Sequence, residues 1–327
     1  MSKQKNKGNF YNSLLFASNK EREGEVHLNL WKISNNNFSL DIGVMLSIAN
    51  KEDTVKLVIF LPFNLEENPE DLGGIIKDKI NTVFNDLYKQ ETGPSKSSIT
   101  LYSKEGTDEP KDSDKFMLYE LGVGEIKLTG INGCTGKLIE CDVNFQNNNE
   151  NNSFENLYIR IRIPINSQEG LSFIRQDENI SNNVIQAAFS KVELYDFRLN
   201  DLRDTDDKVY QYLIKSFQLI KLKKVHFFFM TDAKDHISNG NMDCMDSRML
   251  EIAKWEKYIG TMTEHAFVAY HWKKTPKNEK TFSSFNVFFR NTCSNNKVWL
   301  ILIYFILALF IGTIGSLIAN FLSKWIS

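Results

Sequence analysis

The chain has 327 residues, of which 42% are hydrophobic and 24% charged, and its formal net charge is −2. This length allows one large domain or two small ones with a real core, and the charge excludes the overall basic surface of a duplex-DNA-binding protein. Four cysteines without CxxC or any other metal-ligand spacing favour free thiols in a reducing compartment over a disulfide framework.

The first half of the chain is rich in β-forming residues. Residues 25–33, 38–48 and 54–63 either alternate between apolar and polar side chains or run apolar. The segments "SNNN" and "ANKED" between them have turn compositions. These patterns predict that a β-meander opens the protein.

The period of the apolar residues changes in residues 68–88, where they recur at spacings of three and four. Asn68 suits the N-cap position and Pro69 the first helical position, and two acidic residues follow. This segment is predicted to be a helix.

Strand patterns return in the second half of the chain, where two helices are also predicted, at residues 206–220 and 245–259. The predicted strands are residues 125–131, 137–145, 154–165, 190–199, 223–230 and 265–272. We therefore predict an α+β fold, in which residues 1–274 form a β-rich region with a few packed helices. This region can be divided into two sub-domains, about 1–150 and 151–274. Residues 275–296 are polar with one aromatic cluster and are predicted to be a juxtamembrane linker.

Residues 297–323 are predicted to be a transmembrane helix. No side chain from Val298 to Ala319 carries a charge, and about 20 apolar residues suffice to cross a bilayer. Trp299 and Trp325 stand toward opposite ends, where aromatic rings favour the membrane interface. The alternative, a buried helix of a soluble core, does not fit a segment that is apolar on every face.

The charges on either side of this segment indicate its orientation. Lys277, Lys280, Arg290 and Lys297 precede it, whereas only Lys324 follows it. Positive charge favours the cytoplasmic side, and the basic first 20 residues lack the apolar run of a signal peptide. We expect a tail-anchored, single-pass protein with a cytoplasmic N-terminal region.

Small and polar residues line the faces of the predicted transmembrane helix. Small residues let helix backbones approach one another in lipid, and hydroxyl and amide groups can hydrogen-bond between helices or line a wet lumen. A homo-oligomer built at least partly by this helix is predicted, with contact or pore residues Gly312, Gly315, Ser316, Ala319 and Asn320. The alternative is a lone anchor that tolerates such residues.

No sequence motif points to an enzyme. No GxSxG, HExxH or Rossmann glycine pattern occurs, and "TGINGCTGKL" lacks the spacing and the Ser or Thr of a phosphate-binding loop. His265 and His271 would stand about 20 Å apart on one strand, too far to share a metal. We therefore expect no enzymatic activity, cofactor or metal. The histidines are expected to lie at the surface or to hydrogen-bond to other side chains.

Two basic features are candidates for binding an anion. In "YIRIRIPI", Tyr158, Arg160 and Arg162 alternate with three isoleucines, which predicts an exposed sheet face. Arginine suits bidentate phosphate contact and tyrosine can stack on a base. A second basic run contains Lys221, Lys223 and Lys224. The candidate ligand is a nucleotide or a short single-stranded oligonucleotide; the alternative, a solvated face paired with carboxylates across strands, is the more common arrangement.

This layout resembles the membrane effectors of bacterial anti-phage defence operons, including the channel component of Hailong systems. The resemblance lies in the β-rich region, the closely packing segment "LALFIGTIGSLIANF" and the absence of a catalytic motif. It implies a homo-oligomeric ion channel of the bacterial inner membrane, regulated by a nucleotide-like ligand and active in antiviral defence. The alternatives are a tail-anchored scaffold or adaptor, which localises a protein-binding domain to membrane lipid, and, less favoured, a membrane-tethered hydrolase.

Overall fold

The computed structural model describes residues 11–34, 37–48, 54–65, 67–84, 87–91, 99–106, 115–144, 155–165, 173–176, 190–238, 240–260, 266–294 and 298–326. The fold is α+β, and the chain divides into two compact units. Unit 1 comprises Met1–Ile174, Tyr195–Ala233 and Asn239–Phe289, and unit 2 comprises Arg175–Leu194, Lys234–Ser238 and Arg290–Ser327.

The first sheet of unit 1 has the strand order β19-β13-β1-β4-β10-β9. Its strands are β1 (Ser13–Ser18), β4 (Thr54–Leu61), β9 (Ile126–Thr129), β10 (Lys137–Asn144), β13 (Ser190–Leu199) and β19 (Phe285–Ser294). The short strands β12 (Ile174–Gln176) and β14 (Gln218–Leu219) pair with β13 and β1. Strands β13 and β19 each continue into unit 2.

The second sheet of unit 1 has the strand order β17-β18-β15-β2-β3-β11-β8-β7-β6, with β5 paired to β11. Its long central strands are β2 (Glu23–Lys32), β3 (Phe38–Ser47), β11 (Asn156–Ile165), β15 (Lys221–Asp232) and β18 (Phe267–Lys274). The shorter strands are β5 (Glu70–Asp71), β6 (Tyr88–Glu91), β7 (Ile99–Lys104), β8 (Phe116–Tyr119) and β17 (Asp246–Met249).

The two sheets of unit 1 pack face to face through aromatic side chains. The rings of Tyr195 and Phe229 lie 4.8 Å apart, and those of Phe197 and Phe227 lie 4.9 Å apart. Because side chains alternate along a strand, Phe227 and Phe229 of β15 point between the sheets. His226 and Phe228 therefore point to the opposite, outer face of the second sheet.

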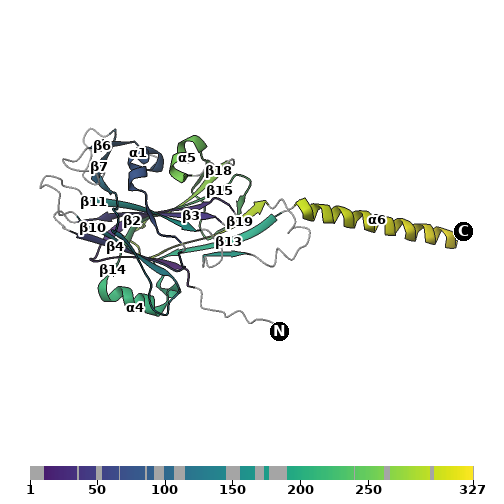
Figure 1. Cartoon of the computed structure of the whole chain (residues 1–327), viewed down its shortest axis with the longest axis horizontal. Coiled ribbons are helices and arrows are strands. Elements are labelled where there is room, and N and C mark those ends of the chain that lie inside the picture. The colour runs from purple at the N-terminus through teal and green to yellow at the C-terminus, as the bar shows by residue number, and fades with distance from the viewer. Residues whose placement is uncertain are drawn as a thin grey trace. The chain divides into compact units, whose positions relative to one another are not determined.

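Helices cover the outer faces of both sheets, so the unit has four layers (Figure 1). The helices α1 (Gly73–Phe84) and α5 (Ile252–Ile259) share one apolar cluster with the second sheet, which includes Trp31, Tyr158 and Trp255. The helix α4 (Asp207–Ser216) packs Val209 and Leu213 on the first sheet. A 3-10 turn, η2 (Leu202–Asp204), precedes α4.

Several predicted elements differ from the structure at their ends. The helix predicted at 68–88 forms only from Gly73 to Phe84, and β5 and β6 flank it. The helix predicted at 206–220 is α4 followed by β14, and that predicted at 245–259 is β17 followed by α5. In each case, pairing with a neighbouring strand outweighs the local helical pattern.

The predicted meander and linker are wrong. Strands β2 and β3 pair with each other, but β4 belongs to the first sheet and pairs with β1 and β10. Within residues 275–296, β19 is a strand of the first sheet, and its Phe285, Val287 and Phe289 are buried. A sub-domain boundary near residue 150 is also wrong, because strands from both sides of it pair within each sheet.

Unit 2 contains the strand β16 (His236–Ser238), which pairs with β19, and the helix α6 (Val298–Ile326). Within α6, Leu302–Ser323 is long and apolar enough to cross a membrane, with a mean hydropathy of 2.4. None of that segment is buried within the protein. An isolated apolar helix of this kind needs a nonpolar environment outside its own chain.

Candidate ligand-binding groove

The outer face of the second sheet contains two cavities that adjoin each other. The larger has a volume of about 550 Å³ and the smaller about 200 Å³. They share five lining residues, Asn29, Val83, Phe84, His226 and Phe228. Val83 and Phe84 come from the end of α1, while Trp255 of α5 lines the smaller cavity. We refer to the two cavities together as the groove.

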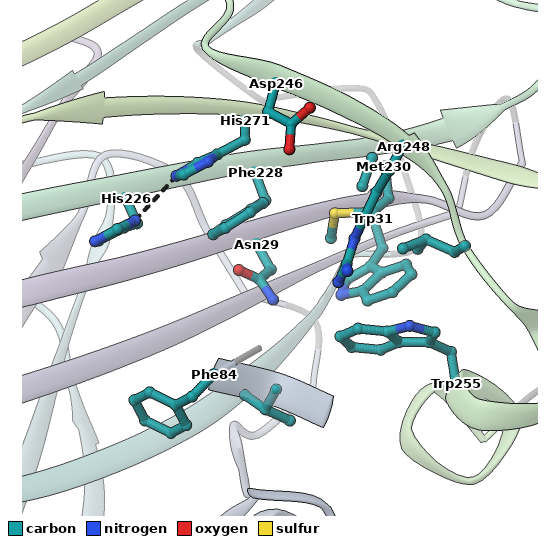
Figure 2. Close-up of a pocket in the computed structure, with 13 residues that line it drawn as sticks. Asn29, Trp31, Phe84, His226, Phe228, Met230, Asp246, Arg248, Trp255 and His271 are labelled. Atoms are coloured by element: carbon teal, nitrogen blue, oxygen red, sulfur yellow. Dashed lines mark hydrogen bonds between the residues drawn. The ribbon is translucent and has the colours of Figure 1, made fainter. Parts of the chain in front are cut away.

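Three histidines from adjacent strands form a row along the groove. His27 of β2 and His226 of β15 are direct neighbours in the parallel register, with ring centres 5.1 Å apart. The planes of the His226 ring and of the ring of His271, on β18, lie within 7° of parallel. His226 Nδ1 lies 2.9 Å from His271 Nε2, a hydrogen bond drawn in Figure 2. The tertiary structure brings these histidines together from distant parts of the sequence.

Burial and nearby cations keep the histidine row neutral. Desolvation, together with His271, Lys224 and Lys273, lowers the pKa of His226 to about 3. Desolvation also lowers the pKa of His27 well below its usual value, and with Lys273 it lowers the pKa of His271. Neutral imidazoles offer both hydrogen-bond donors and acceptors, and an anion in the groove would favour their protonation.

Positive charge predominates among the described residues that line the larger cavity. These include Lys104, Arg160, Lys224 and Lys273 but a single carboxylate, Glu25. The Lys224 ammonium lies 3.0 Å from Glu25 and is largely neutralised by it. Lys273 forms no ion pair with the part of the chain that the structure describes. The cavity therefore carries a net positive charge suited to an anion.

Arg160 is buried at the wall of the larger cavity. Its side chain is 2% exposed, and Nη1 donates a hydrogen bond to the Tyr158 hydroxyl at 3.0 Å. Its Nη2 lies 4.0 Å from the Asp41 carboxylate, whereas Nε has no hydrogen-bond partner within the described residues. A buried donor without a partner is costly, so it marks a place where a bound acceptor would be stabilised.

The predicted exposure of Tyr158, Arg160 and Arg162 is wrong. The three residues do lie opposite the isoleucines of β11, but α1 and α5 cover their face of the sheet, and they are only 0%, 2% and 8% exposed. Tyr158 lies across Gly43 of β3, where a Cβ atom would collide with its hydroxyl. Its hydroxyl also lies 3.3 Å from His27 Nδ1. Tyr158 thus has no free face on which a base could stack.

Arg162 belongs to a buried network that holds α5 against the sheet. Its Nε donates to Asp41 at 2.7 Å, and its Nη1 donates to the main-chain oxygen of Tyr258 in α5 at 2.7 Å. The Asp41 carboxylate also accepts hydrogen bonds from Trp31 Nε1 and the Tyr258 hydroxyl. Arg162 therefore positions α5, the helix that carries Trp255, and is not among the residues lining the groove.

The basic run of β15 is paired with acidic residues of β2 and of the segment just before it. Lys221 forms an ion pair with Glu21, and Lys223 lies 3.0 Å from Glu23. The strands β15 and β2 run parallel, and an irregularity at Lys223 shifts the register, so only Lys224 directly faces its ion-pair partner, Glu25. Of the three lysines, only Lys224 lines the groove, so the cross-strand alternative describes Lys221 and Lys223 better.

Aromatic residues dominate the smaller cavity. Phe228 stacks on His271 with ring centres 4.1 Å apart and planes within 5°. Figure 2 shows these two rings on one side of the cavity and Phe84 and Trp255 on the other. Asp246 and Arg248, from the edge strand β17, provide its charged groups. The described residues contain no group of three His, Cys, Asp or Glu side chains that could hold a metal.

The residues predicted to form contacts in α6 are exposed on that helix. Ala308, Gly312, Thr313 and Ser316 line a shallow hollow together with Phe305 and Leu309. Gly315, Ala319 and Asn320 are also exposed, and no described residue of the chain covers them. Their predicted role in assembly stays a prediction, since it concerns contacts between chains.

No protein-family model matches this chain, and no curated protein matches it either. The groove therefore has to be interpreted from its own chemistry. Sequence reasoning identified Arg160 and Lys224 but missed the histidine row, Lys273 and the aromatic cavity. The alternation within β15 and β18 placed these side chains on a sheet face, but no local signal showed that the two strands are neighbours.

Proposed function

We propose that this protein is a membrane-anchored receptor for a phosphorylated ligand. The observation that carries this proposal is the groove, where a cavity of about 550 Å³ is lined by cationic side chains and two histidines: Arg160, Lys224, Lys273, His27 and His226. That volume lies in the range typical of small-molecule sites. Among the described residues, Arg160 Nε has no hydrogen-bond partner and the Lys273 ammonium has no ion pair, and these are the groups to which we propose that an anion binds.

The ligand class that we propose is a nucleotide or the end of a short single-stranded oligonucleotide. Both carry phosphate groups, and both can place a planar base beside the aromatic residues of the groove. Small residues on α6 support self-association in the membrane. Binding would change the arrangement of the helices in a homo-oligomer and thereby gate an ion pathway, as expected of a defence effector in a bacterial plasma membrane.

A binding assay on the full chain tests the receptor proposal. Detergent-solubilised protein is titrated calorimetrically with tripolyphosphate and with nucleoside triphosphates. We expect binding that weakens with salt and falls about tenfold in Lys273→Gln, because this variant removes one charged contact. Lys127→Gln is the matched control, since Lys127 lies on β9 and pairs with Asp142. Absence of binding by every compound would refute the proposal.

A protease-accessibility assay tests the proposed orientation. If the N-terminal region is cytoplasmic, protease added to intact spheroplasts will leave it uncut, and permeabilisation will expose it. Cleavage without permeabilisation would show the opposite orientation.

The alternative function, a tail-anchored adaptor, is favoured by the edge strand β17. Its residues Asp246–Met249 are all exposed, and its outer edge could pair with a partner strand. An adaptor would bind none of the phosphate compounds.

A further inference from the structure

The two cavities of the groove differ in chemistry. The larger cavity holds four of the groove's cations, Lys104, Arg160, Lys224 and Lys273, against one carboxylate. The smaller cavity contains one cation and one carboxylate, Arg248 and Asp246, and otherwise mostly aromatic and apolar side chains. A ligand that occupies both therefore needs an anionic end and a planar, largely apolar end.

The smaller cavity is lined on two sides by aromatic rings. Phe228 and His271 present nearly parallel rings on one side, and Phe84 and Trp255 lie on the other (Figure 2). Trp255 is held in place by Trp31, whose ring centre lies 5.6 Å away, and by Tyr258 at 5.4 Å. Stacking of a base between aromatic side chains is a favourable and recurrent arrangement.

Asp246 and Arg248 place complementary hydrogen-bonding groups at this cavity. They are two residues apart on β17, so their side chains lie on the same side of that strand. An ionised aspartate accepts hydrogen bonds only, and an arginine donates only. A planar ring that carries a donor next to an acceptor on one edge could hydrogen-bond to both residues, and nucleobases have such edges.

From these observations we infer that the groove binds its ligand in one orientation, with the phosphates in the larger cavity and a nucleobase in the smaller one. In this orientation Asp246 and Arg248 read the hydrogen-bonding edge of the base and determine which nucleotide is preferred. The Asp246 carboxylate also disfavours the reverse orientation, because it would face the phosphates. This inference rests on the proposed function and adds the recognition of the base.

The experiment compares ligands that share the phosphate chain but differ in the base. Full-length protein in detergent is titrated with tripolyphosphate, ATP, CTP, GTP and UTP at fixed salt. We expect at least one nucleotide to bind about tenfold more tightly than tripolyphosphate, because stacking adds to the phosphate contacts. Asp246→Asn replaces an acceptor by a group that also donates, so the ranking of the four nucleotides should change by about tenfold for at least one pair.

Controls separate this inference from the receptor proposal. Asp243→Asn, at an exposed position just before β17 and outside the groove, should leave the ranking unchanged. Asp246 is exposed, so its variant is expected to fold, and the tripolyphosphate affinity of Asp246→Asn reports whether the phosphate site is intact. If tripolyphosphate binds as tightly as every nucleotide, or if the ranking survives Asp246→Asn, the inference is wrong while the receptor proposal stands. If none of the five compounds binds, both are wrong.

Discussion

His226 Nδ1 and His271 Nε2 lie 2.9 Å apart on adjacent strands, although 45 residues separate them in the sequence. The planes of their rings lie within 7° of parallel, and Phe228 stacks on His271. The pair is half-buried beside Lys224 and Lys273, and both pKa values lie below the usual value for histidine. Protonation of this pair is therefore linked to the stability of the fold and to the occupancy of the groove.

Stability should fall in mild acid because of His226. An unfolded histidine takes up a proton near pH 6.5, whereas His226 in the folded state does so only near pH 3. The unfolded state thus binds more protons between these values, so the contribution of His226 is complete above pH 6.5 and is lost as the pH falls toward 3. In His226→Gln, the loss of melting temperature between pH 7.5 and pH 5 should be smaller than in the wild type.

Thermal unfolding of the detergent-solubilised chain, monitored by circular dichroism at both pH values, measures this effect. His236→Gln is the matched control, because His236 is exposed and lies outside the groove. An equal loss in the wild type and in His226→Gln would show that other groups cause the acid sensitivity.

Removal of the Asp41 carboxylate should destabilise the fold strongly. Asp41 is fully buried, pairs with Arg162 at 2.7 Å and also accepts hydrogen bonds from Trp31 and Tyr258. Asp41→Ala leaves a buried guanidinium without its counter-ion, which costs about 3–5 kcal/mol. Asp41→Asn retains an acceptor and should lose less. Urea denaturation provides the measurement, and the exposed pair of Glu251 and Lys254 provides the control, because Glu251→Ala should have little effect.

Bulk at Gly312 should weaken assembly without preventing membrane insertion. Gly312 lies in the shallow hollow of α6, where close approach of a second helix needs a small side chain. Leucine favours insertion, so Gly312→Leu should still enter the membrane but give fewer crosslinked oligomers. Ile311→Leu adds no comparable bulk and serves as the control. Unchanged crosslinking in Gly312→Leu would argue for a lone anchor.

Conductance, if the protein forms a channel, should depend on Ser316 and Asn320. These two residues are spaced by four on α6 and provide polar groups on the same helix face. The double variant Ser316→Leu/Asn320→Leu should abolish ion flux in liposomes, because its lumen would become apolar. Crosslinking of the same variant verifies assembly. An adaptor would give no flux even in the wild type, with or without nucleoside triphosphate.

Local patterns in the sequence were enough to predict most of the strands and the apolar C-terminal helix. Alternation along β2, β3 and β11 reflects the geometry of a strand, and α6 is long and apolar enough to cross a bilayer. These properties depend on residues that are close together in the chain. They can therefore be predicted without knowing which other strands or helices pack against them. The α+β class follows from the same patterns.

Tertiary packing decided which side chains meet and which are covered. Alternation in β11 assigned Arg160 and Arg162 to one face, but only the packing of α1 and α5 shows that this face is interior. The sequence around Gly43 does not indicate that the Tyr158 side chain packs over this glycine. The contact between His226 and His271 likewise depends on the pairing of β15 with β18. A periodic pattern specifies the direction of a side chain, whereas burial and charge environment depend on distant segments that the pattern does not contain.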